Sequence, residues 1–545
     1  GDGWSVRGGQ VGTLTLGNGS SGSVGTVSAA NSWAGNFSGD LIGDFVVELP
    51  GGDIVVASPK WAGGAGAVTQ IARANLSSGV ITAANSLVGG AVGDNVGSGP
   101  PDIGGAAITV LSNGNYVVCS PSWQAKRGAA TWVNRNSPLM GRSVGITNSL
   151  VGSSDGDQIC SAGAVALEGN GNYVVASVNV RRDNAGLEFL GAATWGNGQS
   201  GVTGEVSPAN SLFARRGDPL KQLGVFALRR NGNYVVFGRG AGISDGTGYN
   251  PVAWGNGASG GPVGYLSSTN ANYDDAPTGA AKVVPLDNGN YVIARTSWSG
   301  GKGLVVWGSG MSGAPVGPAD AMQGLAGSMV GDFIGTDVTA LKGSGAYVVQ
   351  SPEWAAGRGA ITWRPGTDPA PASVSTANSL VGPSTTSRIG GGLVVPLNNG
   401  SYVAGNPFWY PGNYGAWTWA SGTAPTALTV DFANSVVGIS RNDLLGTISA
   451  SKSLSTGHVV LTAKFFDLPT LGTSDVGAAC EYAGNAAISG GPNDNYCVIG
   501  TQADAGPQWS LIVAPVGRMW AVLRPSERLI SIVTDTDVIF QNGFD

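Results

Sequence analysis

Three short phrases recur in one order along this 545-residue chain, and this repetition limits its possible folds more than any other feature. The first puts Tyr-Val-Val after a Gly/Asn turn, and its leading residue is Ile54, Tyr116, Tyr173, Tyr234, Tyr291, Tyr347, Tyr402 or His458. The second is Ala-Asn-Ser-Leu-Val-Gly, and its Asn position is Asn31, Asn85, Asn148, Asn210, Asn270, Asp320, Asn378 or Asn434. The third, Gly-Ala-x-Thr-Trp, ends at Trp132, Trp195, Trp254, Trp307, Trp363 and Trp419. The phrases predict one structural unit repeated eight times.

Each unit has the sequence signature of four short strands. The first strand is the alternating run before the turn, as in residues 338–341, and the second is Tyr-Val-Val. The third is Ala-x-Thr-Trp, and the fourth is Gly-x-Val-Ser just before Ala-Asn-Ser. Val, Tyr, Thr and Trp favour strands, and Asn-Gly between two such runs indicates a hairpin. A four-stranded unit of this length is typical of a propeller blade, so the predicted fold is an all-β propeller.

The two ends of the repeat array predict how the propeller closes. Residues 11–30 resemble a third and a fourth strand, whereas the last copy, about residues 446–465, supplies only a first and a second. Pairing these halves removes exposed sheet edges, so we expect an eight-bladed propeller over residues 1–466. A seven-bladed propeller and a β-solenoid are the alternatives. Residues 467–545 are expected to form a small strand-rich, disulfide-containing appendage.

Composition excludes several classes of protein. Hydrophobic residues make up 42% of the chain and charged residues only 11%, which excludes a solvated disordered chain. The net charge is −6 and no basic run stands out, so no nucleic-acid partner is expected. No apolar stretch is long enough for a membrane helix.

The cysteines and the scarcity of charge indicate where the protein works. The four cysteines permit two disulfides, Cys480–Cys497 across a Gly/Asn/Pro-rich loop and Cys119–Cys160 between neighbouring repeats. Disulfides form in oxidising compartments. We therefore expect an extracellular or cell-surface protein.

Catalytic and metal-binding residues are scarce. The only histidine, His458, lies in a second-strand position, so Ser-His-Asp and Cys-His catalysis and His-ligated zinc are not expected, and neither is an enzyme. Gly-Asp or equivalent turns recur at Asp40, Asp94, Asp157, Asp218 and Asp332. Their carboxylates either bond backbone N–H groups within turns or form a ring that binds a cation.

Tryptophan offers the candidate ligand-binding residues. Ser-Pro-x-Trp and its variants place Trp61, Trp123, Trp298, Trp354 and Trp409 just after the second strand. Exposed rings in repeated loops can stack on sugars and bind with avidity. The alternative is that each ring fills the gap between two blades. The tryptophans of the third phrase are expected in the core.

The phrases L-x-x-G-N-Y-V-V-x-S-P-x-W, G-A-x-T-W and A-N-S-L-V-G resemble a repeat of large secreted and surface proteins of bacteria, several of them adhesin- or haemagglutinin-like. The match covers residues 11–465. More distantly, the units resemble FG-GAP blades of integrin-type propellers, which typically carry an Asp-rich calcium loop. Here the matching turns are Asn113–Asn115 and Asn231–Asn233, with a single Asp at Asp53 or Asp287, so no cofactor is expected. Residues 537–545 resemble the C-terminal tails of secreted proteins of some Gram-negative bacteria, which implies export.

These observations predict a non-catalytic binding or adhesion protein that presents propeller loops to a glycan, a matrix or a partner surface. One alternative is a structural protein that self-assembles into a filament, sheath or layer. A further alternative is an enzyme that acts on polysaccharide through an unrepeated pair of carboxylates.

Overall fold

The computed structural model describes the chain apart from residues 1–4, 7–8, 18–19, 21–24, 101–105, 185–186, 216–222, 239–242, 244–245, 247, 276–278, 368, 448–450, 469–471, 493–496, 516, 535–537 and 544–545. It forms two compact units. Unit one comprises Gly1–Pro277 and Gly310–Pro318, and unit two comprises Thr278–Ser309 and Ala319–Asp545. Both are built from β-sheets, and no helix within the described residues is long and apolar enough to cross a membrane.

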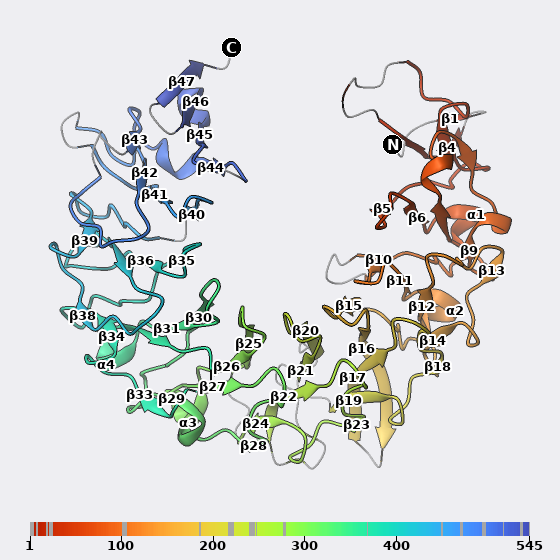
Figure 1. Cartoon of the computed structure of the whole chain (residues 1–545), viewed down its shortest axis with the longest axis horizontal. Coiled ribbons are helices and arrows are strands. Elements are labelled where there is room, and N and C mark those ends of the chain that lie inside the picture. The colour runs from red at the N-terminus through yellow and green to blue at the C-terminus, as the bar shows by residue number, and fades with distance from the viewer. Residues whose placement is uncertain are drawn as a thin grey trace. The chain divides into compact units, whose positions relative to one another are not determined.

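One sheet of unit one shows how the repeat folds. The strands β10 (Ile108–Val110), β11 (Tyr116–Ser120), β12 (Ala129–Val133) and β14 (Ser149–Val151) run antiparallel in that order. A fifth strand, β18 (Gly204–Glu205), runs parallel to β14 (Figure 1). The first and second phrases supply β11 and β14, and the third supplies β12. The all-β repeat is thus confirmed.

The same order recurs in both units. In unit one the sheets are β5 (Phe45–Glu48), β6 (Ile54–Ser58), β7 (Ala67–Ile71), β9 (Leu87–Val88) and β13 (Arg142–Ser143); β15 (Ala164–Ala166), β16 (Tyr173–Asn184), β17 (Leu187–Gly196), β19 (Ser211–Arg215) and β23 (Gly264–Tyr265); and β20 (Leu223–Ala227), β21 (Tyr234–Gly238), β22 (Tyr249–Gly255), β24 (Asn272–Asp274) and β28 (Gly317–Pro318). In unit two they are β25 (Lys282–Pro285), β26 (Tyr291–Arg295), β27 (Leu304–Gly308), β29 (Gly324–Ala326) and β33 (Ala372–Ser373); β30 (Asp337–Ala340), β31 (Tyr347–Ser351), β32 (Ala360–Arg364), β34 (Ser379–Val381) and β38 (Leu428–Thr429); and β35 (Val394–Pro396), β36 (Tyr402–Asn406), β37 (Ala416–Ala420) and β39 (Ser435–Val437).

The fourth strand differs from the prediction. It is the Ser-Leu-Val of the second phrase, whereas the segment before that phrase leaves its own sheet and pairs in parallel with the preceding one. The side chain of Asn210 explains the reversal, because it accepts from the backbone N–H of Ser207 and donates to the carbonyl of Glu205. This bonded turn separates β18 from β19. Each such repeat therefore contributes a short strand to its predecessor.

The glycine that opens the third phrase is required by a close backbone approach. Gly128 has a φ of +76°, and a Cβ there would lie 2.2 Å from the backbone nitrogen of Ile159. Only glycine combines this conformation with this contact. The core then lies between successive sheets, where Val117 and Leu150 pack in one buried cluster with Tyr173 and Phe213 of the next sheet.

Short helical turns connect the strands. One-turn helices follow the second strand at α1 (Trp61–Gly64), α2 (Trp123–Lys126), α3 (Trp298–Gly301) and α4 (Trp354–Gly357). Single 3-10 turns are η1 (Arg73–Asn75), η2 (Ala83–Asn85), η3 (Ala321–Gln323), η5 (Gly506–Gln508) and η6 (Pro525–Glu527).

The ends of the array depart from the expected closure. β41 (Val459–Ala463) pairs with β40 (Lys452–Ser453) and with β42 (Ala478–Tyr482), and β43 (Cys497–Ile499) completes that sheet. The N-terminal strand β3 (Thr13–Thr15) pairs with β4 (Ser32–Ala34), and β4 pairs with β8 (Gly79–Val80). The edge of β41 that was expected to pair with residues 11–30 thus pairs with β42. The expected domain boundary at residue 466 falls between β41 and β42 of one sheet. A partner nearby in sequence costs less loop-closure entropy than one more than 400 residues away.

The remaining strands lie at the two ends of the sequence. β44 (Ser510–Val513), β45 (Trp520–Arg524), β46 (Leu529–Val533) and β47 (Val538–Gly543) form an antiparallel sheet, which confirms that the C-terminal segment is rich in strands. β1 (Ser5–Val6) pairs with β2 (Gly9–Gln10).

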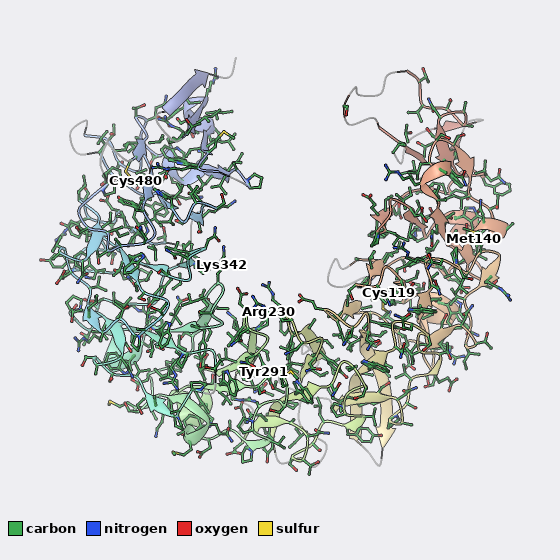
Figure 2. The ribbon with its side chains drawn as sticks, viewed as in Figure 1. Cys119, Met140, Arg230, Tyr291, Lys342 and Cys480 are labelled. Atoms are coloured by element: carbon green, nitrogen blue, oxygen red, sulfur yellow. A yellow bond between two sulfur atoms is a disulfide. The ribbon has the colours of Figure 1, made fainter. Side chains whose placement is uncertain are left out.

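Both expected cysteine pairs are joined. Cys119 of β11 bonds Cys160, which precedes β15 of the next sheet, and Cys480 of β42 bonds Cys497 of β43 (Figure 2). One disulfide therefore links two repeats and the other links two strands. Two disulfides indicate an oxidising environment.

Candidate ligand-binding surface

The in-strand tryptophans and the Asn-Gly-Asn turns fasten each repeat to the next. Trp132 Nε1, Asn113 Nδ2 and Asn115 Nδ2 all donate to the backbone carbonyl of Gly198, at 3.2, 2.8 and 2.8 Å. The same indole bond, at 2.9 to 3.2 Å, joins Trp195 to Gly257, Trp254 to Gly310, Trp307 to Gly366, Trp363 to Gly422 and Trp419 to Gly484. These rings are half-buried. The turn that resembles a calcium loop thus uses its amides to hold a neighbouring carbonyl.

The second and third phrases are joined by a buried chain of hydroxyl groups. Thr131 Oγ1 lies 2.7 Å from Ser149 Oγ, and Ser149 Oγ donates to Asn148 Oδ1. The Thr–Ser contact recurs at 2.6 to 2.8 Å for Thr69 and Ser86, Thr194 and Ser211, Thr362 and Ser379, and Thr418 and Ser435. These phrases therefore recur because each supplies half of a hydrogen-bond network.

The repeated aspartates are turn residues. Asp94 Oδ2 accepts from the backbone N–H groups of Gly90 and Ala91, and its Oδ1 accepts from that of Gln124. Asp40 and Asp332 make the same three types of contact, and Asp157 accepts from Ser153 and Ser154. Asp218 lies outside the described residues. Within the described residues, no group of three or more His, Cys, Asp or Glu side chains could hold a metal ion.

The loop tryptophans proposed to stack on sugars lie largely inside the protein. Trp123, Trp354 and Trp409 are buried, and Trp61 and Trp298 are half-buried. Three of them bond a carbonyl of their own repeat: Trp61 to Ile81, Trp298 to Ala319 and Trp409 to Val430. The expectation of exposed stacking rings is therefore wrong for Trp123, Trp354 and Trp409, because each packs in a buried cluster formed by two successive sheets, as in the alternative interpretation.

His458 lies beside a buried carboxylate. Its Nδ1 is 2.9 Å from Glu481 Oε1, and Glu481 also accepts from Arg518 Nε and from Trp520 Nε1 at 2.7 Å. In the described part of the chain no side-chain hydroxyl is hydrogen-bonded to His458. The cluster connects the sheet of β41 with that of β45.

An exposed group of rings surrounds Trp409, and we call Phe408, Tyr410, Tyr414 and Phe432 the aromatic patch. Phe408, Tyr410 and Phe432 are 37%, 45% and 56% exposed, and Tyr414 is half-buried. Tyr410 contacts Phe432 and Tyr414 at ring-centroid distances of 5.7 and 5.9 Å. The buried Trp409 lies behind them, 5.3 Å from Tyr410 and 5.0 Å from Phe432. Edge-to-face packing of this kind holds rings in fixed orientations.

Polar groups border the aromatic patch. The Arg388 guanidinium lies 5.9 Å from the Phe408 ring centroid and pairs with Glu353. Asn413 Nδ2 donates to Asn442 Oδ1 at 3.2 Å. Rigid aromatic faces beside amides and a guanidinium can bind the apolar faces and the hydroxyl groups of one ligand.

The sequence singled out Trp409, which lies behind the patch, but none of the four patch residues. The sequence feature that could have indicated the patch is Tyr410, because the equivalent residues of the other copies are Ala62, Gln124, Ser299 and Ala355. The aromatic residue at this position distinguishes this repeat from the other four.

Comparisons with known proteins identify the repeat. No curated protein matches the chain. Among solved structures, a eukaryotic initiation factor aligns at 13% identity over 77% of this chain and 94% of its own, with a TM-score of 0.30. Oligopeptidase B from Leishmania major aligns at 11% identity over 82% of this chain and 53% of its own, also with a TM-score of 0.30. A family described as a repeat of unknown function (DUF5650) matches residues 2–44, 48–98, 110–161, 167–217, 285–336, 341–391 and 396–447. The chain belongs to this repeat family.

Proposed function

We propose that this protein is a secreted or cell-surface protein that binds carbohydrate through the aromatic patch. The observation that carries the proposal is the contact between the exposed rings of Tyr410 and Phe432, with the exposed Phe408 two residues before Tyr410 in the chain. Exposed clusters of large apolar side chains mark interaction sites.

The chemistry of the patch favours a sugar. Sugar rings have apolar faces of C–H groups that pack on aromatic rings, while their hydroxyl groups need donors and acceptors nearby. The patch supplies the rings, and Asn413, Asn442 and Arg388 supply the polar groups. Because Tyr410 and Phe432 are held by Trp409, little side-chain entropy is lost on binding.

The scaffold suits a binding role outside the cell. Two disulfides and the bonds from each repeat to the next stabilise a long chain in an oxidising environment. As part of the proposal, successive sheets pack as blades of a β-propeller. Small-angle scattering tests this, because a ring of blades and an open stack give different distance distributions.

A panel of polysaccharides tests the binding role. The full chain is passed through gels containing cellulose derivatives, chitin fragments, xylan, pectin or mucin, and retardation is measured. The double variant Tyr410→Ala/Phe432→Ala should lose at least ten-fold in affinity for any polysaccharide that retards the parent chain. Phe37→Ala is the matched control, because Phe37 is 62% exposed and lies outside the patch. Equal binding by the parent chain and the double variant, or no binding by the parent chain, would overturn the proposal.

A further inference from the structure

A separate pocket lies in unit one, between the Asp94 turn and the one-turn helix α2. Its volume is about 620 Å³, within the range of ~300–1,000 Å³ usual for small-molecule sites. It is lined by residues 90–95, by residues 122–126 and by Val144. Every lining residue belongs to unit one, so the pocket does not depend on the aromatic patch.

The wall of this pocket contains an unused hydrogen-bond donor. Trp123 is only 8% exposed, and its indole Nε1 has no hydrogen-bond acceptor among the described residues. The corresponding nitrogens of Trp61, Trp298 and Trp409 bond the carbonyls of Ile81, Ala319 and Val430. The Trp123 N–H, like that of Trp354, is thus not used within the described residues, and because Trp123 lines the pocket its N–H can donate to a ligand oxygen there.

The three residues after Trp123 have the same left-handed backbone as in the other copies, but the third of them is not glycine. Gln124, Ala125 and Lys126 have φ angles of +46°, +53° and +63°. The residues that correspond to Lys126 in α1, α3 and α4 are Gly64, Gly301 and Gly357. Left-handed backbone at a non-glycine residue is strained, and such strain gathers at ligand sites. Here it places a lysine in the pocket lining where the other copies have no side chain.

The other polar groups define the class of ligand. The side chains of Ser122, Gln124 and Lys126 make no hydrogen bond or ion pair within the described part of the chain, so they offer both donors and acceptors. The lining contains one cation, Lys126, and one anion, Asp94, so it carries no net charge. Trp123, Val92 and Val144 add apolar surface. We infer that this pocket binds a small, uncharged, hydroxyl-rich molecule, a mono- or disaccharide, independently of the aromatic patch.

Nuclear magnetic resonance of the indole N–H groups tests the inference. The Trp123 signal is assigned by its loss in Trp123→Phe, and the Trp354 signal by its loss in Trp354→Phe. Trp354 is the reference because it is also buried and its N–H has no acceptor among the described residues. The probes are the methyl glycosides of glucose, galactose, mannose and N-acetylglucosamine, with cellobiose, and glucuronic acid is the charged comparison. We expect at least one neutral sugar to move the Trp123 signal saturably, with no shift at Trp354 and at least ten-fold weaker binding of glucuronic acid.

A pocket-filling variant separates binding from folding. Gly90 lines the pocket, and a Cβ there would meet only Asp94 Oδ2, at 3.9 Å. Gly90→Leu should abolish the sugar shift and leave the other indole signals in place. The double variant Tyr410→Ala/Phe432→Ala should bind the sugar as the parent chain does, which distinguishes failure of this site from failure of the patch. No shift at Trp123 with any neutral probe, or an unchanged shift in Gly90→Leu, would overturn the inference.

Discussion

Cys480 and Cys497 face each other across β42 and β43 at the position where other repeats place a threonine and a serine. Cys480 pairs with Cys497 in register, as Thr418 pairs with Ser435. Both pairs are 17 residues apart in sequence. The disulfide therefore replaces the buried hydroxyl contact of the repeat, and the sheet of β40–β43 is a further copy of the same unit.

This equivalence predicts that hydroxyl side chains can partly replace the disulfide. Loss of a disulfide that closes a loop of this length costs about 3 kcal/mol of unfolding free energy. Cys480→Thr/Cys497→Ser should recover about 1 kcal/mol relative to Cys480→Ala/Cys497→Ala, because a Thr–Ser hydrogen bond forms again. Denaturant unfolding of both variants measures the difference. Equal stability of the two would show that the sheet does not follow the geometry of the repeat.

The bond from Trp132 to Gly198 predicts a selective loss of stability. Trp132→Phe removes an N–H that bonds the next repeat, and it should lower the unfolding free energy by about 1 kcal/mol. Trp123→Phe is the matched control, because its N–H has no acceptor among the described residues. Thermal unfolding should show the larger drop in melting temperature for Trp132→Phe. A larger drop in melting temperature for Trp123→Phe than for Trp132→Phe would contradict the role of the Trp132 N–H in joining two repeats.

Asp443 predicts a pH-dependent stability. Burial raises the pKa of Asp443 from 3.8 to about 6, although backbone N–H groups of Ser440, Asp467 and Ile439 act in the opposite direction. The native state therefore binds more protons than the unfolded state between pH 4 and 6. The contribution of Asp443 to the unfolding free energy is fully present below pH 4, falls as the pH rises to 6, and is lost above pH 6. The unfolding free energy should decrease by on the order of 1–3 kcal/mol over this range.

The comparison variant for this prediction is Asp443→Asn. Melting temperatures of the parent chain and the variant are measured from pH 3.5 to 7.5. The stability advantage of the parent chain should shrink between pH 4 and 6. An advantage that stays constant, or that grows with pH, would contradict the raised pKa.

The sequence predicted the repeated strands well because strand and turn chemistry are local. Tyr-Val-Val, Ala-x-Thr-Trp and the Asn-Gly turns fall on the second strand, the third strand and the hairpin. The fourth strand was misplaced because its pairing depends on the preceding repeat. Leu150 pairs with Gly204, which is more than 50 residues later, and no local preference specifies that contact.

The sheet of β40–β43 was not recognised as a copy of the repeat, although the sequence contains a signal for it. Residues 477–480, Gly-Ala-Ala-Cys, occupy the position of Gly-Ala-x-Thr, with cysteine in place of threonine. The candidate tryptophans were located correctly after the second strand, but their burial depends on packing that spacing alone does not specify. The aromatic patch was detectable only as an exception to the repeat at Tyr410.

The most direct test of the account is the affinity of the full chain for the polysaccharide that retards it most strongly, measured by titration calorimetry. We predict saturable binding that weakens at least ten-fold in Tyr410→Ala/Phe432→Ala and stays unchanged in Phe37→Ala, with closely similar melting temperatures for all three proteins. Equal affinity in the parent chain and the double variant would contradict the assignment of carbohydrate binding to the aromatic patch.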